Sequence, residues 1–245
     1  MIKTRQIKRQ TEKYTPPEGY RSVPVLSWQP KYTKYFELSP YHLRTDGKEE
    51  HVNPGNVLFE NFWQGSKVYP IVYPITVNPH WTQKDKVLWS RGQETHYTTK
   101  DSSRGTIHPA YYKWRQELWD CPHAIRYPNG RKYRATCAFL LLSHKTKEER
   151  LGYLESRKRV YVQEYKRLVR KLPIYEMLLE ALRKGENLCI QEIDVPCQSK
   201  KGAYNQVNAD GTFDVTLEKL EVLKHDTSEA YGHGLCLAET LLEDQ

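Results

Sequence analysis

The stretch 56–69, NVLFENFWQGSKVY, separates apolar from polar side chains at the spacing of a helix. Its apolar face contains Leu58, Phe59, Phe62 and Trp63. A narrow row on the opposite side, the polar row, consists of Glu60, Gln64 and Lys67, at positions i, i+4 and i+7. Asn56 suits the N-cap and Pro70 stops the helix. The pattern predicts a carboxylate, an amide and an amine presented together; the alternative is a solvated helix face.

Helical periodicity also predicts further helices along the chain. They span 109–119, 147–171, 174–183, 216–223 and 234–242. In 109–119, Pro109 suits the first turn, and four side chains share a face: Tyr111, Trp114, Leu118 and Arg115. Pro173 ends the long helix 147–171.

Extended segments are predicted elsewhere. A strand over 188–195 carries Glu192 and Asp194 on one face, where they form a candidate acid/base pair or, alternatively, solvated or salt-bridged carboxylates. Further candidates are a strand at 22–28, a loop and strand at 35–43, a tight turn at Asp46-Gly47 and a hairpin around Asn129-Gly130 before an apolar run at 135–142.

The domain organisation follows from these elements. Residues 1–20 form a basic arm ending in Pro16, Pro17 and Gly19, which we expect to be disordered or irregularly packed. Prolines make 70–106 irregular. No repeat or linker interrupts the rest, so we predict one helix-rich α+β domain over 21–245, with small antiparallel strands and hairpins.

Composition narrows the class of protein. In 245 residues, 38% of them hydrophobic, no 18-residue apolar run occurs, so no membrane span or membrane partner is expected. The basic N-terminus lacks the apolar core of a secretory signal. The five cysteines are odd in number and widely spaced, which indicates reduced thiols and an intracellular location, in the cytoplasm, the nucleus or an infected host cell. No metal site or cofactor motif is apparent.

Charge is unevenly distributed along a chain of net charge +8. The segment 145–171 holds ten Lys or Arg against four Asp or Glu, a surplus of six positive charges. The segment 218–245 holds two against seven. This pattern favours an anionic partner such as nucleic acid on the basic helix; a solvated basic face is the alternative.

No phosphate-binding Gly-rich loop, HExxH or GxSxG motif is present. The run ENFWQGSKV at 60–68 instead resembles the signature helix of the NADAR superfamily, which has the pattern E-H-aromatic-aromatic-Q-A-x-K-F. Weaker similarities follow in family order. They are 36–40, 46–48, Arg157 with Val160, 178–192 and 232–242. The chain is therefore identified as a divergent NADAR member, with Asn61 in place of the family's His and without its Trp-Gly after the strand that carries Glu192.

The resemblance implies an N-glycosidase that cleaves a ribose C1–N bond, in an ADP-ribosylated base or a phosphorylated ribosylamino nucleotide. It implies catalytic roles for four residues: Glu60, Lys67, Glu192 and Asp194. It implies substrate contacts for four others: Gln64, Asn61, Trp63 and Arg157, the last on pyrophosphate. Two alternatives remain open, a non-catalytic nucleotide- or nucleic-acid-binding module and a structural protein that keeps the fold.

Overall fold

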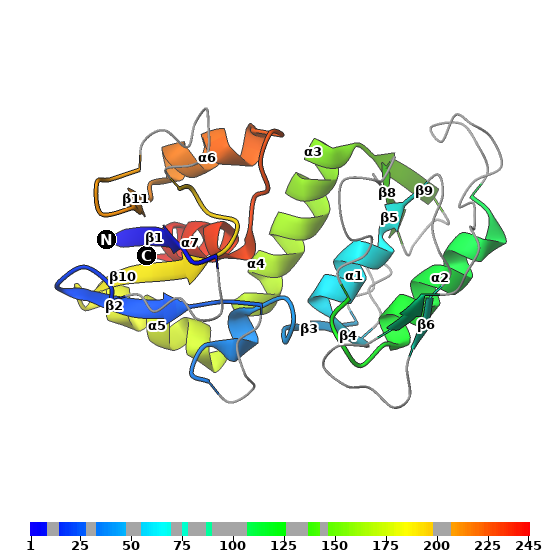
Figure 1. The fold of residues 1–245 in the computed structure, drawn as a ribbon, viewed down its shortest axis with the longest axis horizontal. Helices are drawn as coiled ribbons and strands as arrows, with labels where there is room; N and C mark the ends of the chain where they lie inside the picture. Colours follow the sequence, from blue (N-terminus) through cyan, green and yellow to red (C-terminus); the bar gives the residue numbers. More distant parts are fainter. Residues whose placement is uncertain are drawn as a thin grey trace. The chain divides into compact units, whose positions relative to one another are not determined.

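The structure, a computed structural model, describes most of the chain. The described residues are 1–8, 15–27, 33–47, 55–69, 75–77, 87–89, 107–125, 137–142, 147–197 and 207–245. The chain forms two compact units, which are described separately below. Unit 1 comprises Met1–Leu43 and Arg157–Gln245, and unit 2 comprises Arg44–Ser156. Helices and a mixed sheet confirm the α+β class (Figure 1), whereas the predicted domain limits remain a prediction.

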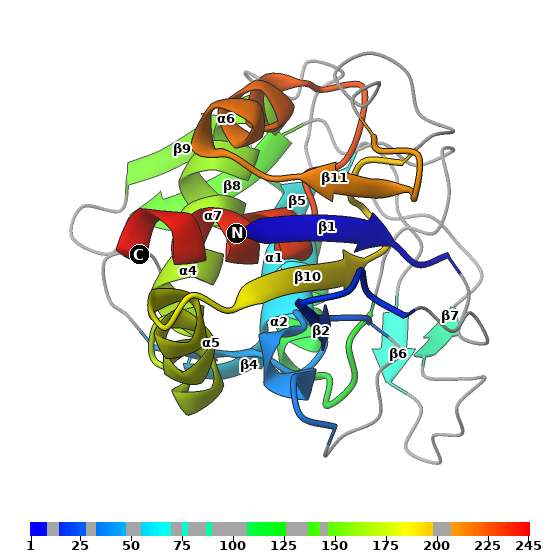
Figure 2. The same cartoon turned by 90° about the vertical axis from the view of Figure 1, so that its left-hand side faces the viewer.

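Unit 1 is built on a four-stranded sheet in the order β11-β1-β10-β2 (Figure 2). The strands are β1 (Ile2–Gln6), β2 (Tyr20–Pro24), β10 (Asn187–Glu192) and β11 (Thr212–Asp214). Both β1 and β2 run parallel to β10, and β11 runs antiparallel to β1. The carboxyl ends of β1, β2 and β10 therefore lie at one edge of the sheet.

The prediction of an irregular N-terminal arm is wrong for residues 2–6, which form an inner strand of this sheet. Ile2 and Thr4 are buried, at 1% and 0% exposure, while Lys3 and Arg5 alternate with them on the other face. The alternation of buried and exposed residues is short here, and the two basic side chains made the segment resemble a solvated arm.

Unit 1 also contains helical elements. They are η1 (Phe36–Leu38), the π-helical segment η2 (Arg157–Val162), α4 (Gln163–Val169), α5 (Pro173–Arg183), α6 (Leu217–His225) and α7 (His233–Asp244). Helix α7 contacts β1, β10, α4, α5 and α6. Its residues from His233 to Leu241 are all buried, so α7 is the core helix of the unit.

Unit 2 consists of short strands and helices. The strands are β3 (Arg44–Asp46), β4 (Gly55–Leu58), β5 (Lys67–Val68), β6 (Ile75–Val77), β7 (Val87–Trp89), β8 (Cys137–Leu142) and β9 (Lys147–Leu151). The helices are α1 (Phe59–Gly65), α2 (Pro109–Asp120) and α3 (Tyr153–Ser156). Strands β3 and β4 pair with each other, β6 pairs with β7, and β8 lies between β5 and β9. Helix α1 packs on α2.

The helix predicted over 56–69 is shorter than expected, because it spans only Phe59–Gly65. Asn56 is not its N-cap; it has a φ of 66° and lies in β4. Val57 pairs with Thr45, whose hydroxyl accepts a hydrogen bond from the Val57 amide at 3.0 Å. Pairing between β3 and β4 thus overrides the helical period before residue 59, and Lys67 lies in β5 beyond the helix.

The helix predicted over 147–171 is wrong for residues 147–151, which form β9 and pair antiparallel with β8. Helical structure begins at Tyr153 and ends at Val169, with η2 in the middle. The irregular structure predicted for 70–106 is wrong where β6 and β7 pair, and the hairpin predicted around Asn129-Gly130 lies outside the described residues.

The strand predicted within 35–43 is wrong, because this segment forms η1 and turns, and the next strand, β3, begins only at Arg44. Other predicted elements are confirmed with boundary shifts. Helices α2, α5, α6 and α7 match four predicted helices, and β10 matches the strand predicted over 188–195. Within the described ranges, no helix has the length and apolarity needed to cross a membrane.

Candidate functional site

Helix α1 is buried on all sides, although three of its seven residues are polar. Phe59, Phe62 and Trp63 are at most 9% exposed, and Glu60 and Gln64 are 7% and 5% exposed. Helix α2 fixes the end of α1, because the Tyr111 hydroxyl donates a hydrogen bond to the Gly65 carbonyl at 2.7 Å. The solvated face considered above therefore does not describe the polar row.

The polar row is linked by hydrogen bonds from end to end. Gln64 Nε2 donates to Glu60 Oε1 at 2.7 Å, and Lys67 Nζ donates to Gln64 Oε1 at 3.0 Å. Lys67 Nζ also lies 4.7 Å from the centre of the Trp63 ring. Lys67 lies in β5 rather than in α1. It still reaches its partners, because only Ser66 separates it from the end of the helix.

This arrangement orients the Gln64 amide unambiguously. Its oxygen faces an ammonium group and its nitrogen faces a carboxylate, so the amide transmits positive character from Lys67 toward Glu60. Among the residues that the structure describes, no donor other than Gln64 hydrogen-bonds to the Glu60 carboxylate. The second oxygen of Glu60 accepts no hydrogen bond from this part of the chain.

Asn61, predicted to contact substrate, is occupied by the backbone. Its Nδ2 donates to the carbonyls of Cys121 and His123 at 3.2 and 2.8 Å, and its Oδ1 accepts from the Ile125 amide at 2.8 Å. The side chain is 0% exposed. These bonds hold the segment after α2 against α1, which is a structural role.

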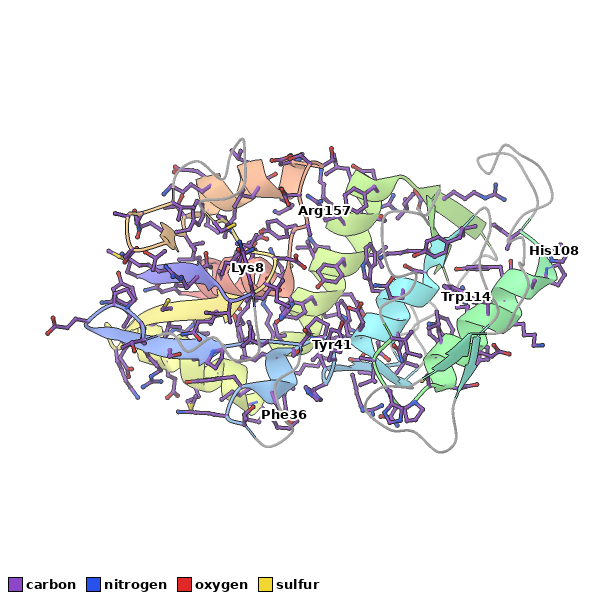
Figure 3. All side chains as sticks on the ribbon, viewed as in Figure 1. Lys8, Phe36, Tyr41, His108, Trp114 and Arg157 are labelled. Atoms are coloured by element: carbon purple, nitrogen blue, oxygen red, sulfur yellow. The ribbon has the colours of Figure 1, made fainter. Side chains whose placement is uncertain are left out.

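Arg157, predicted to bind pyrophosphate, is similarly occupied (Figure 3). Its guanidinium donates to four backbone carbonyls after and at the end of α6: Leu223, Lys224, Asp226 and Glu229. At 2% exposure, Arg157 closes the C-terminus of α6 and the following turn. A phosphate would have to compete with these carbonyls.

Glu192 lies at the carboxyl end of β10, next to the N-terminus of α7. Its Oε1 is 3.5 Å from His233 Nδ1, and the His233 Nε2 hydrogen-bonds to the Val25 carbonyl. The ring of His233 thus has one nitrogen on a backbone carbonyl and the other facing a carboxylate. His233 and Glu192 thus link the end of β2, β10 and α7. Gly234 beside them has no room for a side chain, since a Cβ there would lie 2.9 Å from Glu192 Cβ.

The candidate residues are divided between the two units. Unit 2 contains Glu60, Asn61, Trp63, Gln64 and Lys67. Unit 1 contains Arg157, Glu192 and Asp194, and Asp194 lies in the turn after β10. The expected approach of Glu192 or Asp194 to the polar row across a cleft remains a prediction.

The acidic tail neutralises part of the basic helix. Lys166 Nζ lies 2.7 Å from both Glu239 and Glu243, and Arg170 pairs with Glu243 and Asp244. Lys224 Nζ also reaches Glu239, at 2.6 Å. The positive surplus of 145–171 is thus partly balanced inside unit 1, rather than left entirely for an external anion.

Glu239 is the centre of this charge network. Burial raises its pKa, but hydrogen bonds from Lys166, Lys224 and the Tyr231 hydroxyl outweigh burial and hold the pKa below its ordinary value. The reciprocal effect appears at Lys224, where burial lowers the pKa but the hydrogen bonds that its ammonium group donates to Glu221 and Glu239 outweigh burial and raise it. Glu239 joins α4, α6 and α7 through charge.

The described residues contain no group of three or more His, Cys, Asp or Glu side chains that could hold a metal ion. Sequence reasoning did not single out His233 or Glu239, because nothing local marks them; each acquires its partners from distant parts of the chain. No protein-family model, curated protein or solved structure matches this chain.

Proposed function

We propose that the chain is an N-glycosidase that hydrolyses the ribose C1–N bond of an ADP-ribosylated base or a phosphorylated ribosylamino nucleotide. The observation that carries the proposal is the buried, hydrogen-bonded polar row of Glu60, Gln64 and Lys67. Its residues coincide with the conserved polar positions of the signature that the sequence resembles.

The carboxylate of Glu60 has the charge that this reaction needs. As the C1–N bond breaks, its electron pair moves to nitrogen, and positive charge develops on C1 and the ring oxygen of ribose. A carboxylate at 7% exposure stabilises that charge more strongly than one in water. Water adds to C1 and gives a proton to Glu60, and this proton passes on to the released nitrogen, so that the carboxylate is restored.

The contacts of Lys67 favour a phosphate-binding role over a nucleophilic one. A hydrogen bond to Gln64 Oε1 and the face of Trp63 both stabilise the positively charged ammonium group. A Schiff-base nucleophile requires the neutral amine instead. We therefore assign Lys67 to neutralising a substrate phosphate and to orienting Gln64.

The test is a comparison of Glu60→Gln with the wild type. The substitution keeps the shape and removes the charge, so substrate should still bind while turnover falls by about 10²- to 10⁴-fold. The assay measures free base or ADP-ribose released from ADP-ribosylated guanosine, with a ribosylamino-pyrimidine phosphate as parallel substrate. Glu155→Gln is the matched control, since Glu155 is an exposed acid of the same unit.

Lys67→Ala separates the two roles of the amine. As a phosphate contact, its loss should mainly weaken binding, and borohydride should trap no adduct on Lys67 in the wild type. If the wild type releases nothing from either substrate, or if Glu60→Gln retains full activity, the glycosidase proposal fails. A binding module would then be the better interpretation.

A further inference from the structure

Helix α2 carries a buried arginine that its own surroundings do not neutralise. Arg115 is 8% exposed. Among the residues that the structure describes, no carboxylate pairs with its guanidinium and no oxygen accepts a hydrogen bond from it. A guanidinium is always charged and has five N–H donors, so burial without acceptors is unfavourable unless another group supplies them.

A second buried guanidinium among the described residues, that of Arg157, has all the acceptors that Arg115 lacks. Arg157 donates to four backbone carbonyls and has no need of an external anion. The guanidinium carbon of Arg115 instead lies 4.4 Å from the centre of the Trp119 ring and 5.6 Å from those of Tyr111 and Tyr112. These rings stabilise the charge through their faces, and no acceptor among the described residues meets the N–H edges of the guanidinium.

Gly65 creates the space in which this arginine lies. A Cβ at Gly65 would lie 3.2 Å from Arg115 Cγ and 2.9 Å from Trp119 Nε1. Trp119 Nε1 is itself buried and has no hydrogen-bond partner in the described part of the chain. Arg115 and Trp119, one helical turn apart on α2 (the helix that carries Trp114 in Figure 3), thus lie together beside the end of α1, and the Trp119 N–H is the buried donor without an acceptor among the described residues.

We propose that Arg115, held on the Trp119 ring, binds an oxyanion in unit 2, with a phosphate or phosphate ester preferred. A planar guanidinium donates two parallel hydrogen bonds to two oxygens of such a group, and the aromatic ring beneath fixes its plane. The site was not among the predicted ones, because periodicity placed Arg115 on the buried face of α2 and gave it no chemical role. The proposal does not depend on glycosidase activity, because the binding of phosphate alone tests it.

The experiment titrates inorganic phosphate into the full chain by calorimetry at constant ionic strength, with sodium acetate as the second oxyanion. The wild type should bind phosphate more tightly than acetate. Arg115→Met keeps the length of the side chain and removes the donors, so phosphate affinity should fall by at least about tenfold. Arg115→Lys keeps the charge but removes the planar pair of N–H donors, so its affinity for phosphate should also fall.

Lys113→Met is the matched control, since Lys113 is an exposed cation on the same helix. Its phosphate affinity should remain within about twofold of the wild type, because screened surface charges contribute little. The proposal is overturned if wild-type protein binds no phosphate, if acetate binds as tightly, if Arg115→Met binds phosphate normally, or if Lys113→Met loses as much.

A measurement on unaltered protein covers the case in which Arg115 variants do not fold. Phenylglyoxal modifies accessible guanidinium groups, and peptide mass spectrometry reports the extent at each arginine. Arg115 should react, and phosphate should protect it while chloride at equal ionic strength does not. An Arg115 that never reacts, or that phosphate does not protect, shows that the guanidinium only packs on the rings.

Discussion

Glu239→Gln should destabilise unit 1 strongly, even though the substitution is nearly isosteric. The wild-type carboxylate faces Lys166 at 2.7 Å and Lys224 at 2.6 Å, and its other oxygen accepts from the Tyr231 hydroxyl at 2.8 Å. Both Glu239 and Lys166 side chains are 5% exposed. The amide would leave two ammonium groups near each other without the charge that compensates them.

The expected loss is about 3–5 kcal/mol of the free energy of unfolding, the usual cost of breaking a buried ion pair on one side. With a urea dependence of about 2–3 kcal/mol per molar, the unfolding midpoint should fall by about 1–2 M. Far-UV circular dichroism in urea measures it. Glu218→Gln is the control, because Glu218 is exposed on α6 and its midpoint should hardly change.

The same carboxylate predicts a pH dependence of stability. Since the pKa of Glu239 is lowered in the folded state, its contribution is complete above the ordinary carboxyl pKa of 4.5 and is lost as the pH falls further. The wild-type midpoint should therefore fall more steeply below pH 4.5 than that of Glu239→Gln. Equal midpoints for Glu239→Gln and Glu218→Gln at neutral pH would refute the argument.

Two further predictions concern residues whose roles the sequence left open. Asn61→Ala removes three hydrogen bonds to the backbone and should lower the free energy of unfolding of unit 2 by about 2–4 kcal/mol in urea. Gln116→Ala, at an exposed position, is the control. A loss below about 1 kcal/mol would contradict the structural role of Asn61. The basic segment 145–171 should bind duplex DNA weakly, with a slope of log K against log salt no steeper than about −5, because four of its ten cations are engaged internally. Affinity that is unchanged between low and high salt would rule out phosphate contacts.

The local sequence pattern predicted correctly those elements whose tertiary contacts favour the same secondary structure. Helix α5 lies where periodicity places it, because it buries the face that its own spacing defines. Strand β10 also lies where it was predicted, although it is buried on both faces from Leu188 to Glu192. At 56–58 and 147–151 the helical period was also present, but pairing with β3 and β8 prevailed. Tertiary pairing of this kind cannot be read from a window of a dozen residues.

The candidate site was predictable to the same extent. The spacing i, i+4 and i+7 brought Glu60, Gln64 and Lys67 into one row, and that row exists although the helix ends before Lys67. The occupancy of Asn61 and Arg157 depends on carbonyls more than sixty residues away along the chain. Sequence shows that a side chain can donate, and only the folded chain shows whether its donors are already used.

The parallel pairing of β1 with β10 sets an order of events during synthesis. Ile2 pairs with Leu188 and Gln6 with Glu192, so the first strand has no partner on that side until the ribosome has delivered residue 192. The segment of unit 2, Arg44–Ser156, is continuous and is complete well before that point. Unit 2 can therefore fold before β10 is available to pair with β1. A stalled or truncated chain would expose β1 as an unpaired strand with a strong tendency to aggregate.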